Sequence, residues 1–324
     1  MKKPIFIDNQ HQDEFDENGF VKITNFSLTT DDIQILFDFY DNSGIKKYSE
    51  EAVYMAMDNP DKQLISHMYK TIETIVMSHL NKILVNPMFF YGSFISKYPN
   101  SKVTVLPHQD GTFVDNENEQ YSLTCWIPLV DVDIENGCMG VIKNSNKIYD
   151  SIRPLPSPQV YRPLNKHAFS IMPYFKLIPM KAGEILFFDN KTFHNSPPNL
   201  TDKPRLAISS WITQENTPLR LYYLKPGTNN KLLKYAIDKN FYLKYDNLIL
   251  SKMYSENKLI EDYNCIEEVD YVYKDFSKRK MNNEIEKLGN LPNQDFKTHM
   301  NKFFPNEMNT SVWDKLKIKL IKLF

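Results

Sequence analysis

Between residues 88 and 224 the sequence contains eight short segments rich in β-branched and aromatic residues, bounded by proline, asparagine and glycine. The segments are MFFYGSFISKY, KVTVL, YSLTCWIPLV, CMGVI, KLIPM, EILFF, RLAISSWIT and LRLYYL. No long helix separates them. Short strands in this arrangement predict a mainly β domain built as a sandwich, barrel or jelly roll.

Helices are expected on the N-terminal side of this β region. Residues 13–26 are typical of a helix end followed by a strand. Residues 29–40 (TTDDIQILFDFY) predict a helix that Thr29 or Thr30 can cap, with acidic residues in its first turn. A second helix is expected over residues 61–84, where the apolar residues follow helical spacing.

Two other segments have a different character. Residues 151–175 contain five prolines and little periodicity, and an irregular insertion of this length in a β domain is usually a lid or a binding loop. Residues 227–324 have helix-like apolar spacing and predict a helical C-terminal extension. At its end, residues 311–324 can form a basic amphipathic helix, which would lie on an anionic membrane surface or dock on the protein itself. An edge strand is the third alternative there.

The overall composition excludes some classes of partner. The formal net charge is −1 and no basic stripe is evident in the first 220 residues, so nucleic acid is not an expected partner. The opening MKKPIFIDNQ has too few consecutive apolar residues for the hydrophobic core of a signal peptide. Three widely spaced cysteines fit a reducing compartment. We therefore expect a cytoplasmic protein.

A metal site is suggested by the stretch PHQDGTF at residues 107–113. His108 and Asp110 alternate along an expected strand and would project to the same side. His194 follows another apolar strand and is the best third ligand. Two histidines and one carboxylate leave three coordination positions open, which suits Fe(II) with a cosubstrate and O₂, whereas zinc more often takes a third histidine or a thiolate. Arg205 could hold the far carboxylate of a chelating 2-oxo acid.

Several motifs together resemble the phytanoyl-CoA dioxygenase family of Fe(II)/2-oxoglutarate oxygenases. They are HQD at 108–110, CWIPLVDVDIENG at 125–137, AGEILFFDNKTFHNS at 182–196 and PRLAISSW at 204–211. The opening DENGFVKITNFSLTTDDI is also similar. The resemblance covers about residues 12–224 and implies an oxygenase domain over residues 1–226. Its core, about residues 88–224, would be a double-stranded β-helix of the jelly-roll, cupin-like type.

The resemblance also implies roles for individual residues. The implied iron ligands are His108, Asp110 and His194, and Arg205 would pair with the distal carboxylate of 2-oxoglutarate. Other positions that match family positions near this cosubstrate, or lie between the ligands, are Ser196, Trp126, Lys97 and Gln109. A protein of this kind consumes O₂ and 2-oxoglutarate and releases succinate and CO₂. Since the carboxylate ligand is present, hydroxylation is favoured over halogenation.

The sequence also departs from the family. Many relatives have a Pro-Gly-Ser-His turn where this chain has Lys143–Asn146, and the tail after residue 226 lies outside the resemblance. The expected substrate is a small metabolite or a carrier-linked biosynthetic intermediate. Two other functions stay open: a non-catalytic jelly-roll module that binds a ligand, and a cupin-like metal enzyme that does not use 2-oxoglutarate. No oligomeric state is predicted.

Overall fold

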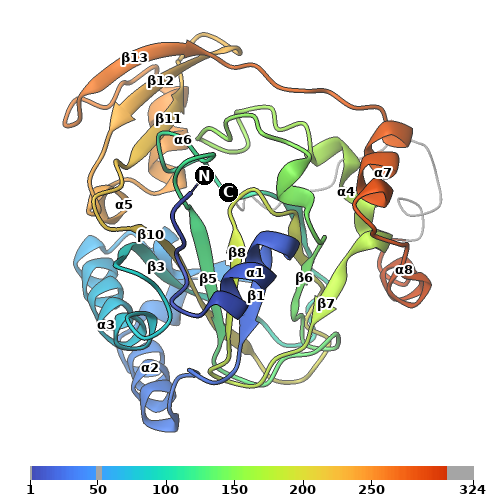
Figure 1. Ribbon diagram of the computed structural model, residues 1–324. Coiled ribbons are helices and arrows are strands. Elements are labelled where there is room, and N and C mark those ends of the chain that lie inside the picture. The colour runs from blue at the N-terminus through green and yellow to red at the C-terminus, as the bar shows by residue number, and fades with distance from the viewer. Residues whose placement is uncertain (1, 49–52, 305–324) are drawn as a thin grey trace.

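Two antiparallel sheets form the centre of the molecule (Figure 1). The computed structural model describes residues 2–48 and 53–304. The six-stranded sheet has the order β1-β8-β5-β10-β3-β2. Its strands are β1 (Phe20–Ile23), β2 (Val53–Met55), β3 (Pro87–Lys97), β5 (Leu123–Pro128), β8 (Ile185–Asp189) and β10 (Arg205–Gln214). The four-stranded sheet, in the order β4-β9-β6-β7, consists of β4 (Val105–His108), β9 (His194–Ser196), β6 (Met139–Val141) and β7 (Lys176–Ile178).

A shared apolar layer joins the two sheets. Trp126 and Phe188 of the larger sheet belong to the same buried cluster as Val141 and Ile178 of the smaller one. Each of the eight strands that the sequence predicts between residues 88 and 224 is present, and the jelly-roll expectation is confirmed. The side chains that alternate toward the interior therefore lie between two sheets, where polar groups are shielded from water.

Helices α1 (Asn9–Asn18), α2 (Thr30–Asn42) and α3 (Lys62–Leu80) share one apolar cluster with the six-stranded sheet. In α2 the Thr29 side chain accepts from the Asp32 backbone N–H at 3.1 Å, and the Asp32 carboxylate accepts from the Thr29 N–H at 2.9 Å. This capping box confirms the predicted start of the helix. The second helix ends at Leu80, four residues before the predicted end, because the following residues pair with the N-terminal segment, as in the Phe6–Leu84 bridge.

The C-terminal extension is not purely helical, and the sequence prediction was wrong for two segments of it. Strand β11 (Arg220–Leu224) pairs with β12 (Lys231–Ala236), which pairs with β13 (Cys265–Asp270) in a separate three-stranded sheet. Between these strands lie α5 (Phe241–Lys244) and α6 (Asn247–Ser255). The free edge of β11 offers backbone groups that a following hairpin strand can satisfy, and this pairing outweighs the helix-like spacing of the extension.

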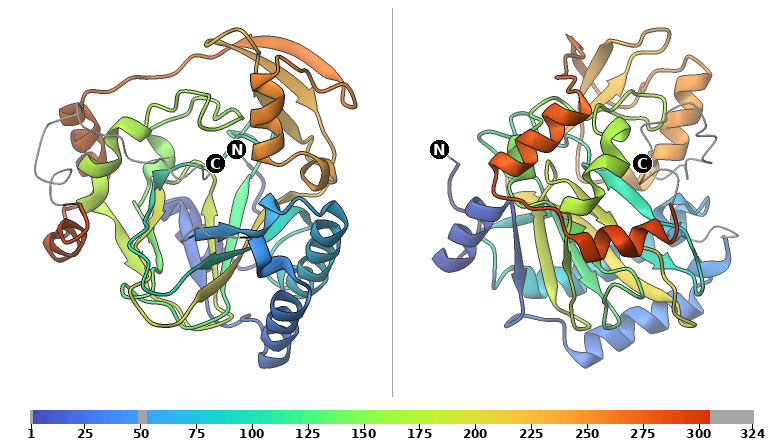
Figure 2. Two further views of the ribbon diagram at one scale, coloured as in Figure 1. Left: turned by 180° about the vertical axis from the view of Figure 1, so that it is seen from behind. Right: turned by 90° about the vertical axis from the view of Figure 1, so that its right-hand side faces the viewer.

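After β13 the chain crosses the molecule to α7 (Lys278–Lys287) and α8 (Gln294–Asn301), on the side away from β13 (Figures 1 and 2). Met281 and Ile285 of α7 join the apolar cluster of the 151–175 segment. That segment, predicted to be irregular, contains the short helix α4 (Ala168–Ile171) and two 3₁₀ turns, Asn165–His167 and Met172–Tyr174. The extension thus packs on the jelly roll in two places.

Among residues 2–48 and 53–304, no helix has both the length and the apolar content that crossing a bilayer requires. The amphipathic segment at 311–324, for which we predict either membrane or self-docking contact, lies outside the described residues.

Candidate metal centre and its pocket

The three predicted metal ligands converge in the structure. His108 and His194 are register partners at the ends of β4 and β9, with ring centroids 4.1 Å apart. Asp110 follows just beyond β4, where its backbone N–H donates to the Asn190 carbonyl at 2.9 Å. Asp110 Oδ1 lies 3.6 Å from His194 Nε2, and one ligand atom from each of the three residues lies within 4.8 Å of the others. This spacing fits a single metal ion.

The hydrogen bonds of both imidazoles prepare them for metal binding. His108 Nδ1 lies 2.8 Å from the Leu106 carbonyl and His194 Nδ1 lies 2.9 Å from the Thr192 carbonyl. Because a carbonyl only accepts, each Nδ1 carries a proton, and Nε2 is the nitrogen of each ring that can bind a metal. Burial, together with the neighbouring His194, holds the pKa of His108 well below its usual range. His108 is therefore a neutral imidazole at pH 7, which is the ligand form.

Two residues that the sequence analysis did not identify hold Asp110. The Thr124 hydroxyl donates to Asp110 Oδ2, which leaves Oδ1 toward the histidines. Arg153 donates through Nε to the Asp110 carbonyl at 2.6 Å and forms an ion pair with Glu117. Thr124 lies two residues before Trp126 on β5, so strand alternation places both on one face and could have indicated it.

Arg205, at the start of β10, is almost completely buried, with 2% of its surface exposed. Its Nη2 lies 3.5 Å from the Ser196 hydroxyl, and its guanidinium carbon lies 5.6 Å from the centre of the Trp126 ring. Within the described part of the chain, its Nε and Nη1 have no hydrogen-bond partner. Burial lowers the pKa of Arg205 to about 10, so it is charged at neutral pH. A buried cation with two open donors is suited to binding an anion.

Lys97 is fully buried beside Arg205 but directs its amine elsewhere. Its Nζ donates to the backbone carbonyls of Ser196, at 2.9 Å, and Pro197. Burial and the neighbouring Arg205 hold the pKa of Lys97 well below its usual range. Gly137 makes this arrangement possible, because it has a φ of +83° and an added Cβ would lie 2.5 Å from the Pro197 carbonyl oxygen. Lys97 therefore supports the strand ends rather than lining the pocket.

One pocket contains most of the predicted residues. The metal ligands, Thr124, Trp126, Ser196 and Arg205 all line it, together with apolar residues such as Met139 and Phe188. Gln109 is not among them, because its amide turns away and donates to the Lys191 carbonyl at 2.7 Å. The structure thus brings together a metal-ligand set and a buried guanidinium, the two groups that a chelating dicarboxylate would need.

Comparison with known proteins gives consistent matches. The model of the phytanoyl-CoA dioxygenase family matches residues 8–207. The phytanoyl-CoA dioxygenase domain-containing protein 1 of Bos taurus is 27% identical over 194 residues, which cover 53% of this chain and 67% of that protein. A phytanoyl-CoA dioxygenase of Arabidopsis thaliana is 30% identical over 162 residues, or 43% of this chain and 53% of that protein.

The non-haem α-ketoglutarate-dependent carbocyclase SnoK from nogalamycin biosynthesis aligns with a TM-score of 0.47 and 21% identity, over 66% of this chain and 87% of that chain. HygX of Streptomyces hygroscopicus, with nickel and 2-oxoglutarate bound, aligns with a TM-score of 0.48 and 12% identity, over 65% of this chain and 88% of that chain.

Proposed function

Since this chain belongs to the phytanoyl-CoA dioxygenase family and is an Fe(II)- and 2-oxoglutarate-dependent oxygenase, we propose that it hydroxylates an aliphatic C–H bond of a small molecule. The observation that carries this proposal is the shared pocket of the metal ligands and Arg205. The substrate is a small metabolite or a carrier-linked biosynthetic intermediate. The cytoplasmic location stays a prediction.

The three metal ligands and Thr124 each have a defined role in this proposal. His108 and His194 bind the metal through Nε2, and Asp110 binds it through Oδ1. Bound Fe(II), with 2-oxoglutarate and O₂, supplies the oxidising power for C–H cleavage and yields succinate and CO₂. The Thr124 hydroxyl donates to Asp110 Oδ2 and fixes the carboxylate, so that Oδ1 is the oxygen that faces the metal.

Arg205 binds the distal carboxylate of 2-oxoglutarate through the two donors that lack partners among the described residues. Ser196 accepts from Nη2 while it donates to the Gly137 carbonyl at 2.8 Å, and the Trp126 ring lies beside the guanidinium. These contacts fix the orientation of the Arg205 guanidinium before the cosubstrate binds, which lowers the entropic cost of binding. Because Arg205 is buried, the low local dielectric strengthens its pairing with a carboxylate.

The open donors of Arg205 also separate the candidate functions. A cupin-like metal enzyme without a 2-oxo acid has no use for a buried guanidinium next to its metal. A non-catalytic module would not need three converging metal ligands, one of them the neutral His108 imidazole. The buried charge favours an enzyme that binds a dicarboxylate.

The test is an anaerobic titration of the protein with Fe(II) and 2-oxoglutarate, followed by the weak visible charge-transfer absorption of the chelate. We expect the band in wild type, no band in His194→Ala, and a requirement for at least a hundredfold more 2-oxoglutarate in Arg205→Met. Arg279→Met, an exposed site on α7, is the matched control and should behave as wild type. No band in iron-loaded wild type would refute the proposal.

A further inference from the structure

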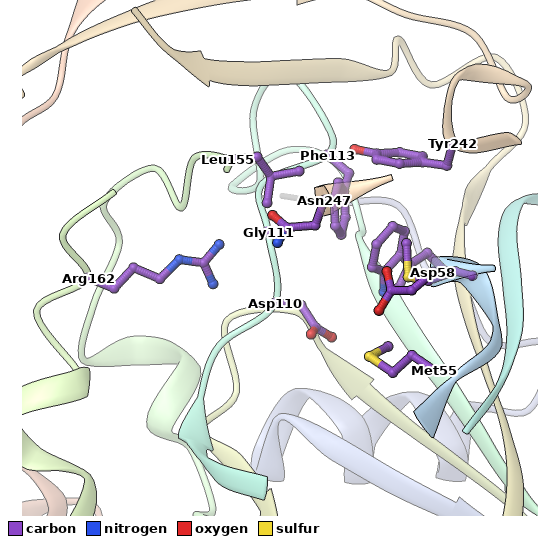
Figure 3. Close-up of a pocket in the computed structure, with 11 residues that line it drawn as sticks. Met55, Asp58, Asp110, Gly111, Phe113, Leu155, Arg162, Tyr242 and Asn247 are labelled. Carbon is purple, nitrogen blue, oxygen red and sulfur yellow. The ribbon is translucent and has the colours of Figure 1, made fainter. Parts of the chain in front are cut away.

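A second pocket adjoins the metal centre (Figure 3). Asp110, Met55 and Trp211 line both this pocket and the one that contains the metal ligands. A molecule in the second pocket would therefore lie directly beside the metal. Its remaining wall comes from parts of the chain far apart in sequence, including Arg162 of the 151–175 segment and Tyr242 of the extension.

Arg162 gives this pocket a buried positive charge. Its side chain is 8% exposed, and Figure 3 shows its guanidinium reaching toward the pocket. Nη1 donates to the Gln109 carbonyl at 3.2 Å and Nη2 to the Pro154 carbonyl at 3.0 Å, while Nε has no partner among the described residues. These two carbonyls orient the Arg162 guanidinium, but they are uncharged and do not neutralise its positive charge. Burial lowers the pKa of Arg162 to about 10, so the charge persists at pH 7.

Tyr242 of α5 provides a polar group at another side of the pocket. The residue is 5% exposed and its hydroxyl has no hydrogen-bond partner in the described part of the chain. In Figure 3 the hydroxyl end of the ring points over Phe113 toward the pocket. Between Arg162 and Tyr242 the pocket is lined by the apolar Phe113, Leu155 and Trp211 and by Asn247, whose amide is hydrogen-bonded to the Ser157 backbone.

The extension also fixes the segment that carries Arg162. Asn247, at the start of α6, accepts from the Ser157 backbone N–H at 2.9 Å and donates to the Ser157 carbonyl at 2.7 Å. The Tyr271 hydroxyl donates to the Tyr161 carbonyl at 2.7 Å, one residue before Arg162. The family match ends at residue 207, so these contacts come from a part of the chain that the family model does not describe.

We infer that the second pocket is the substrate subsite, and that it takes a small molecule with an apolar body and one anionic group, a carboxylate or a phosphate. The anion lies on Arg162 and the apolar body lies along Phe113, Leu155 and Trp211, with Tyr242 as the far wall. The positive charge of Arg162 places the anionic end on its side of the pocket, and Asp58 lies on the opposite side (Figure 3). This inference rests on the proposed function, because it assigns the substrate of the same metal centre.

The test is isothermal calorimetry on protein loaded with Mn(II) and N-oxalylglycine, an inert analogue that occupies the cosubstrate site. The probes are hexanoate, hexyl phosphate and the neutral hexanamide. One charged hydrogen bond corresponds to about ten- to a hundredfold in affinity. We therefore expect wild type to bind at least one anionic probe at least tenfold more tightly than the amide, and the better probe separates carboxylate from phosphate.

Variants assign the preference to Arg162. Arg162→Met should reduce it to within about twofold, Arg162→Lys should retain part of it, and the exposed control Arg279→Met should keep all of it. With decanoate as an additional, longer probe, Tyr242→Ala should raise the affinity of decanoate relative to hexanoate severalfold, because the far wall is removed. Thermal melts monitor folding, and because both readouts are ratios between probes, a moderate loss of folded protein does not imitate them.

Two results would overturn the inference: equal binding of acid and amide in wild type, or an anion preference that survives Arg162→Met. A chain-length ratio unchanged by Tyr242→Ala would overturn the assignment of the wall. The charge-transfer band at the metal is read separately and does not involve the probes. A normal band without probe discrimination rejects only the subsite, whereas a missing band together with Arg162-dependent anion binding in metal-free protein rejects only the oxygenase proposal.

Discussion

Replacing Arg205 by methionine should change stability in opposite directions without and with 2-oxoglutarate. In the free protein the buried guanidinium has two donors without partners among the described residues. Removing an unsatisfied buried polar group recovers ~1–3 kcal/mol. The variant also loses the cation–π contact with the Trp126 ring, which costs only ~0.5–1 kcal/mol because the 5.6 Å separation is near the outer limit for such pairs. The ligand-free variant should therefore be more stable than wild type by about 1–2 kcal/mol, or roughly 2–4 °C in Tm.

Addition of 2-oxoglutarate should reverse the order. Two charge-assisted hydrogen bonds of ~1.5–3 kcal/mol each correspond to a Kd for 2-oxoglutarate that rises at least a hundredfold in the variant. At a concentration of 100 times the wild-type Kd, the cosubstrate stabilises wild type by about 2.7 kcal/mol. The same concentration stabilises Arg205→Met by at most about 0.4 kcal/mol. Wild type then becomes the more stable protein.

The assay is thermal unfolding of both proteins with Mn(II), with and without 2-oxoglutarate, with Arg279→Met as the control for a generic loss of charge. A crossing of the two Tm values is the expected outcome. If the ligand-free variant is less stable than wild type, Arg205 has an internal anionic partner and the argument from open donors fails. If 2-oxoglutarate stabilises the variant as strongly as wild type, its carboxylate binds elsewhere.

Three further predictions concern the surroundings of the site. Thr124→Val removes the hydroxyl that donates to Asp110 at nearly constant volume, so Co(II) affinity measured by absorption titration should fall ~10- to 100-fold, and an unchanged affinity would show that the bond is dispensable. Gly137→Ala should lower the free energy of unfolding by ~1–3 kcal/mol in urea titrations, because the new Cβ meets the Pro197 carbonyl at a positive φ; a neutral effect would contradict this. Burial lowers the pKa of His167 to about 4, so the unfolded chain binds more protons between pH 4 and 6.5 and stability should fall as pH decreases through that range. His167→Gln should flatten this slope in urea titrations at pH 7, 6 and 5, and an identical slope would exclude this histidine as a contributor.

Local patterns predicted most of the elements because their causes are local. The Thr29 capping box needs only residues three apart, and the strands of the jelly roll need only a few β-branched or aromatic residues in a row. Strands β2 and β9 were not predicted, and β9 (His194–Ser196) contains none of the β-branched or large aromatic residues that are enriched in strands. Strands β12 and β13 were missed because their pairing depends on the edge of β11, a partner that spacing within the extension does not reveal.

The sequence likewise predicted some residues of the site and missed others. The sequence identified His108, Asp110, His194 and Arg205 by residue type and order. It also placed Gln109 among the possible cosubstrate contacts, whereas the structure turns the Gln109 amide away from the pocket toward the Lys191 carbonyl. It did not identify Thr124, whose importance comes from a hydrogen bond across two sheets. The roles assigned to the ligands and to Arg205 stay predictions until metal and 2-oxoglutarate binding are measured.

The sequence by itself determined which chemical groups are available and which local elements carry them, because caps, alternation and turns depend on neighbours along the chain. Only the tertiary structure decided that Arg162 and Tyr242, 80 positions apart, line one pocket beside Asp110, and that the extension holds the segment that carries Arg162. Such contacts arise from packing and from the requirement that buried backbone groups find partners, and neither leaves a period in the sequence.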